Sequence, residues 1–155
     1  MTQELEVLDE GHKGWLSWIV ARDHSTRSSR HRLDSLLPRM ALLGEAACGR
    51  PIGKGWQEIS RKAAELRAHN FAKSGLAYAP IRARLREGLV ERKARLFFEH
   101  FAEDARAFTN CSLVANLEGQ QTVAGWDPIS ASTFDMAFGL TGEQVTGIFC
   151  IEDED

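Results

Sequence analysis

Cys111 is the residue of this sequence best suited to nucleophilic chemistry. A catalytic thiolate needs a nearby base and an acid that orients the base, and His100 and Asp104 lie a few residues before Cys111. No local motif surrounds these residues, and a cysteine in an apolar strand is more often a small buried side chain. A small enzyme is therefore the third of three functional hypotheses. Such an enzyme could also use two pairs of acids for acid–base chemistry or magnesium binding, Glu103 with Asp104 and Asp127 with Asp135.

Residues 49–55, GRPIGKG, contain the residue types that bind phosphate, since glycine amides and a lysine can surround a phosphate group. The spacing between the glycines is one residue shorter than in the Walker pattern, and no Ser or Thr follows Lys54 to bind magnesium. The stretch also follows a predicted helix, where that pattern requires a strand. We interpret it as a connector between helices.

The histidines and cysteines do not predict a metal site. No i, i+4 pair of the kind found in zinc-binding helices occurs among His12, His24, His31, His69 and His100. A zinc site would require CxxC spacing, and a disulfide framework would require an even number of cysteines. Neither requirement is met by Cys48, Cys111 and Cys150. We predict reduced thiols, no metal and no cofactor.

Charge is divided between two parts of the chain. All 19 Lys and Arg residues lie between Lys13 and Arg106, and with 14 acids they give residues 1–106 a formal charge of +5. Residues 107–155 contain eight acids and no Lys or Arg, which gives −8. Such asymmetry indicates either that the basic part packs against the acidic part or that the protein binds a charged partner.

The acidic part predicts a binding surface for a basic protein partner. Clustered acids accelerate encounter with such a partner and fix its register, and four acids directly follow an apolar strand here. The leading hypothesis is a non-enzymatic protein–protein interaction module, such as an inhibitor, immunity protein or antitoxin of bacterial type. The residues assigned to this surface are Asp135, Glu143, Glu152, Asp153, Glu154 and Asp155.

The basic part supports an alternative hypothesis, a nucleic-acid-binding regulator that uses helices at residues 57–73 and 80–106. The letters RLREGLVER, residues 84–92, are similar to the end of the recognition helix and the start of the wing in winged helix-turn-helix repressors. The resemblance implies phosphate contacts from basic side chains and a helix in the major groove. A solvated face of a long helix is the other interpretation of the same charges. The residues concerned are Arg82, Arg84, Arg86, Arg92, Lys93 and Arg95.

Apolar residues recur at helical spacing over most of the first 106 residues. Helices are predicted at residues 13–22, from Asp34 or Ser35 to about residue 49, at 57–73 and at 80–106. The polar residues 23–29 predict a loop between the first two helices.

Beyond Ala107 the apolar period changes to two, which predicts strands. Short strands are expected around residues 113–117 and 121–126, followed by a hairpin of residues 134–140 and 144–151. The predicted fold class is α+β, with about four N-terminal helices packed on one face of a C-terminal antiparallel sheet of three to four strands.

Length and composition favour a single domain over residues 1–155, with a basic helical part at 1–106 and an acidic β part at 107–155. The start, MTQELEVLDE, is acidic where a secretory signal is basic and then apolar, and no apolar run approaches the roughly 18 residues of a membrane helix. We therefore expect a cytoplasmic protein with no membrane partner. The sequence predicts no oligomeric state.

Overall fold

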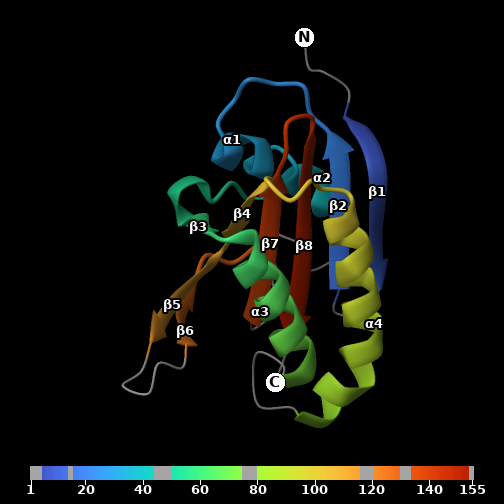
Figure 1. The fold of residues 1–155 in the computed structure, drawn as a ribbon, viewed down its shortest axis with the longest axis vertical. Coiled ribbons are helices and arrows are strands. Elements are labelled where there is room, and N and C mark those ends of the chain that lie inside the picture. The colour runs from blue at the N-terminus through green and yellow to red at the C-terminus, as the bar shows by residue number, and fades with distance from the viewer. Residues whose placement is uncertain are drawn as a thin grey trace.

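The computed structural model describes residues 5–13, 16–43, 50–74, 80–115, 121–129 and 134–153. In these residues the centre of the molecule is a six-stranded antiparallel sheet with the order β1-β2-β8-β7-β4-β3, and a separate two-stranded ribbon, β5-β6, extends from it (Figure 1). The strands of the sheet are β1 (Glu6–Lys13), β2 (Leu16–Arg22), β3 (Gln57–Ile59), β4 (Arg106–Thr109), β7 (Phe134–Thr141) and β8 (Val145–Asp153). The ribbon consists of β5 (Cys111–Ala115) and β6 (Gln121–Trp126).

Helices cover both faces of the sheet. The short helices α1 (Ser29–Asp34) and α2 (Leu37–Met40) lie on one face, and the longer helices α3 (Arg61–Ser74) and α4 (Pro80–Glu99) lie on the other (Figure 1). A single turn of 3₁₀ helix, η1 (Gly53–Gly55), precedes β3. The buried side chains accordingly form two clusters, one on each face of the sheet.

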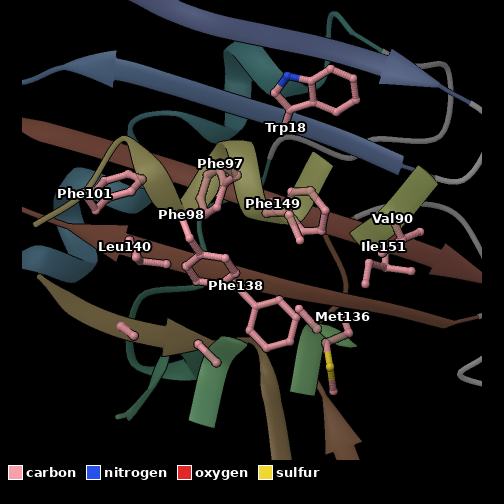
Figure 2. Close-up of a cluster of buried hydrophobic side chains, with 14 of the residues drawn as sticks. Trp18, Val90, Phe97, Phe98, Phe101, Met136, Phe138, Leu140, Phe149 and Ile151 are labelled. Carbon is pink, nitrogen blue, oxygen red and sulfur yellow. The ribbon is translucent and has the colours of Figure 1, made fainter. Parts of the chain in front are cut away.

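Aromatic side chains of α4 form the centre of the larger cluster. The ring centroid of Phe97 lies 5.5 Å from that of Phe98 and 5.4 Å from that of Phe101. It also lies 5.5 Å from the ring of Phe149 in β8, and Figure 2 shows these rings gathered over the strands. Gly147 permits the approach, because a Cβ there would lie 2.8 Å from Phe101 and 2.9 Å from Phe97. Close aromatic packing therefore holds α4 against β8.

The smaller cluster lies beneath α1 and α2. Leu33 of α1 packs on Gly139 of β7, where a Cβ would lie 2.7 Å from the leucine side chain. Trp56 is fully buried in the same cluster. The predicted hairpin of residues 134–140 and 144–151 is confirmed as β7 and β8, which contribute alternate residues to the two clusters.

The predicted helix at residues 13–22 is wrong, because residues 16–22 form the strand β2. This strand lies between β1 and β8, and residues 16–21 are all buried. Helices cover both faces of the sheet, so both sides of β2 are apolar and the run LSWIVA is apolar almost throughout. Such a run does not distinguish a helix from a strand that is buried on both faces. The strand geometry is evident in the packing, where Trp18 and Val20 join one cluster and Ile19 joins the other.

Two of the other predicted helices begin at different residues. The helix predicted from Asp34 or Ser35 begins earlier, as α1, because the Ser28 side chain accepts a hydrogen bond from the His31 amide at 3.3 Å and caps the helix there. The first residues of the helix predicted at 57–73 form β3 instead. The helix α3 begins after Ser60, whose Oγ accepts from the Ala63 amide at 3.0 Å.

The helix predicted at residues 80–106 ends at Glu99. Arg61 of α3 donates to the backbone oxygens of Phe98, at 2.8 Å, and Phe101, at 2.8 Å. These bonds supply partners for carbonyl groups that the end of a helix leaves without intrahelical donors. The chain then turns and enters β4 at Arg106.

The predicted arrangement of the fold is therefore wrong, although the α+β class holds. The sheet has six strands rather than three to four, and three of them come from the first 59 residues. Because α1 and α2 form one interrupted segment, the described residues contain three helical units rather than about four, and these cover both faces of the sheet. None of the described helices combines the length and the apolar composition needed to cross a membrane.

Candidate functional site

A cavity of about 430 Å³ lies between α3 and α4. Each helix contributes charged side chains spaced four residues apart, which places them in a row along one side of the helix. The row on α3 is Arg61, Glu65 and His69, and the row on α4 is Glu91, Arg95 and Glu99. Two apolar residues, Ala94 and Phe98, also line this cavity, which we call the α3–α4 groove.

One end of the α3–α4 groove is fixed by Arg61. Its guanidinium donates to Glu65 at 3.1 Å and to backbone oxygens of Phe98, Phe101 and Ala102. The positive charge of Arg61 is thus placed against the C-terminal carbonyls of α4, where the helix dipole favours a cation. Arg61 holds the two helices together and has little freedom to bind a ligand.

At the end of the groove opposite Arg61, His69 and Glu91 face each other from the two helices. The Nδ1 atom of His69 lies 3.4 Å from Oε1 of Glu91, and the side chains are 37% and 46% exposed. The contact is an ion pair only when the imidazole is protonated. With His69 neutral, the two arginines and three glutamates of the groove carry a net charge of −1. The groove therefore combines an apolar lining with a small excess of negative charge.

The acids predicted to bind a basic partner do not form one surface. Asp135 and Glu152 are register partners in β7 and β8 and are only 2% and 6% exposed. Glu143 is exposed in the turn between these strands, whereas Asp153 ends β8 at the opposite end of the hairpin. The side chain of Asp153, and Glu154 and Asp155 entirely, fall outside the described residues.

Asp135 belongs to a buried polar cluster around Asn110. The Asn110 side chain donates to Asp135 Oδ1 at 2.6 Å and to the Asp127 backbone oxygen at 2.9 Å, and it accepts from the Ala137 amide at 2.7 Å. Asp135 also accepts from the Ile129 amide at 3.2 Å. This cluster fastens residues 127–129 to the sheet.

The predicted nucleic-acid-binding residues are distributed around α4. Arg92 is exposed, Lys93 lies over the ring of Trp18 with its Nζ 4.9 Å from the ring centroid, and Arg95 lines the α3–α4 groove. The backbone of α4 includes Arg82, Arg84 and Arg86, whose side chains fall outside the described residues. The helix continues to Glu99, so no strand follows RLREGLVER where a wing would begin.

The structure does not assemble the predicted cysteine site. Burial, reinforced by the charge of Asp135, raises the pKa of the Cys111 thiol to about 12. Its Sγ donates to Asn110 Oδ1 at 3.4 Å, while His100 Nε2 lies 3.4 Å from Asp9 on β1. Cys111 is therefore a buried thiol, and the histidine proposed as its base contacts a different acid. Among the described residues no group of three or more His, Cys, Asp or Glu side chains is arranged to hold a metal ion.

The described part of the glycine-rich loop binds an acid of this chain. The Asp34 carboxylate accepts from the amides of Ile52 and Gly53, both at 2.9 Å, and from the indole Nε1 of Trp56 at 3.0 Å. The backbone donors that could have held a phosphate are used in the fold itself.

Sequence reasoning missed the groove acids Glu65, Glu91 and Glu99 and did not assign His69 to a site. The signal was present as charged residues at four-residue intervals in two predicted helices. It could not be interpreted without knowing that these helices lie side by side. No family model, curated protein or solved structure matches the chain.

Proposed function

We propose that the protein is a non-enzymatic interaction module that receives a basic segment of a partner protein in the α3–α4 groove. The observation that supports the proposal is the groove itself, which brings three carboxylates from two helices to one cavity. Inhibitors, immunity proteins and antitoxins that cover a basic site are the protein classes that fit this chemistry.

The charges of the groove favour a cationic occupant. Glu99 lines the cavity, and Glu91 faces the imidazole of His69 across the groove. Ala94 and Phe98 offer apolar surface for the aliphatic part of a lysine or arginine side chain, whose charged end can then reach the carboxylates. Charge complementarity of this kind speeds association and selects the partner.

The groove replaces the sheet acids as the proposed contact. Asp135 and Glu152 are buried, and Glu143 and Asp153 lie at opposite ends of the β7–β8 hairpin. A basic partner could not touch all of them at once. The groove acids, in contrast, all line a single cavity.

The test is the affinity of a hexa-arginine peptide for the full chain at low salt, measured by calorimetry. The variant E65Q/E91Q/E99Q should bind about tenfold more weakly, since exposed ion pairs typically contribute about 0.2–1 kcal/mol each. A matched variant, E6Q/E103Q/D127N, removes three exposed acids outside the groove and should bind within about twofold of the parent.

Equal affinities for the parent and the groove variant would overturn the proposal. Equal weakening in the groove variant and its matched control would also overturn it, because the peptide would then be sensing only net charge. Tight binding of a short DNA duplex, lost at high salt, would support the nucleic-acid alternative instead.

A further inference from the structure

We infer that His69 makes partner binding in the α3–α4 groove dependent on pH, by acting as an internal cation that competes for Glu91. The inference rests on the proposed function and concerns how pH regulates partner binding in the groove. His69 belongs to α3 and Glu91 to α4, so the contact of 3.4 Å between them crosses the cavity.

The competition follows from the chemistry of imidazole. Histidine is the side chain whose ordinary titration changes its charge between pH 5 and 8. Protonated His69 forms an ion pair with Glu91 and brings the net charge of the groove from −1 to zero. A basic segment entering the cavity then meets a positive charge beside the carboxylate that it would bind.

The remaining charges of the groove do not cancel this effect. Arg61 and Glu65, on the same helix as His69, are paired with each other at 3.1 Å. Arg95 and Glu99 face the groove from α4 together with Glu91. Arginine stays charged across the range from pH 7.5 to 5.5 and glutamates titrate mainly below it, so imidazole is the side-chain type of the groove lining that ordinarily changes charge there.

Linkage fixes the direction of the effect. If protonation of His69 weakens binding of a cation, then binding of the cation weakens protonation of His69 by the same factor. Acidification should therefore release the partner, and partner binding at intermediate pH should release a proton. Both side chains are partly exposed, so the factor should be that of a surface ion pair, about threefold to fivefold.

The experiment compares hexa-arginine affinity at pH 7.5 and 5.5 for the parent chain, H69Q and H24Q. His24 is an exposed loop histidine and serves as the matched control. The parent and H24Q should lose about threefold to fivefold in affinity on acidification, and H69Q should change by less than about 1.5-fold. The histidine ring signals in NMR spectra should show that His69 takes up its proton at lower pH in the presence of the peptide.

The outcomes separate this inference from the proposed function. Parent affinity that is lost in E65Q/E91Q/E99Q but does not change between pH 7.5 and 5.5 would overturn the role of His69 alone. The same pH dependence in H69Q as in the parent would also overturn it. Failure of the parent to bind hexa-arginine at either pH would overturn the proposed function and, with it, this inference.

Discussion

At the scale of single residues, Asp34 shows how one carboxylate can organise a loop. It ends α1 and binds backbone and side-chain donors 18, 19 and 22 positions later in the chain. Two of these donors are the amides at the start of η1, where Gly53 has a φ of 47° that favours glycine. The third is the indole of Trp56, which is fully buried. Sequence reasoning placed Asp34 at the start of a helix, whereas it ends α1, and its distant donors depend on the folded chain.

Asp34→Ala should destabilise the protein by about 2–4 kcal/mol, because it leaves two amides and an indole N–H without their acceptor. Asp34→Asn retains one carbonyl oxygen and should cost less. The free energy of unfolding is measured in urea, and Asp104→Ala, at an exposed turn residue, should remain within about 0.5 kcal/mol of the parent. A loss below about 1 kcal/mol for Asp34→Ala would contradict the assigned role.

At the scale of elements, the prediction succeeded where the apolar period of the sequence is clear and failed where it is not. The hairpin β7–β8, the end of α3 and the start of α4 lie close to the predicted residues, because the apolar periods there are clear. Residues 16–22 have no clear period, because β2 is buried on both faces. The edge strand β1 was not recognised, since its exposed charged residues do not alternate and a register shift lies between Val7 and Asp9.

Gly11 of β1 and Gly88 of α4 should respond in opposite directions to a larger side chain. A Cβ at Gly11 would lie 2.3 Å from the ring of Trp18, so Gly11→Val should displace the indole or the edge strand and cost about 1–3 kcal/mol. Among the described residues, no atom outside the backbone of the same helical turns and the two chain neighbours lies within 4 Å of a Cβ at Gly88. Gly88→Ala in the helix should stabilise by about 0.5–1 kcal/mol. Urea unfolding of both variants tests this, and a neutral Gly11→Val would show that Trp18 is not fixed there.

At the scale of the molecule, the basic and acidic parts of the chain share one sheet. The acidic strand β8 lies between β2 and β7, and β7 also pairs with β4, which begins at Arg106. Ion pairs join the edges of the sheet to neighbouring elements. Arg39 of α2 binds Glu10 of β1 at 2.7 Å and 3.0 Å, and Arg106 of β4 binds Glu58 of β3 through two bonds of 2.8 Å. The charge asymmetry is visible in the sequence. The placement of acidic strands beside strands from the basic part is not, because it depends on strand order.

These two ion pairs predict how stability changes with pH. Hydrogen bonds from Arg39 and Arg106 lower the pKa of Glu10 and of Glu58 below their ordinary values. A carboxyl group with a lowered pKa in the folded state stabilises that state above its ordinary value, near pH 4.3, and loses this contribution as the pH falls further. E10Q/E58Q should therefore have a shallower loss of stability between about pH 5 and 3 than the parent or E103Q. Urea midpoints across this range test it, and parallel curves would contradict it.

The position of β8 in the sheet also bears on how the chain reaches its folded state during synthesis. This strand is the last of the described elements to leave the ribosome, yet it lies between β2, made more than a hundred residues earlier, and β7. Until it arrives, the β1–β2 hairpin has no partner on its inner edge, and the apolar faces of β2 stay partly uncovered. Pairing across so long a separation is slow. A nascent chain of this protein therefore exposes the edge of β2 until β8 is made, and we expect chaperones that bind extended apolar segments to act on it at that stage.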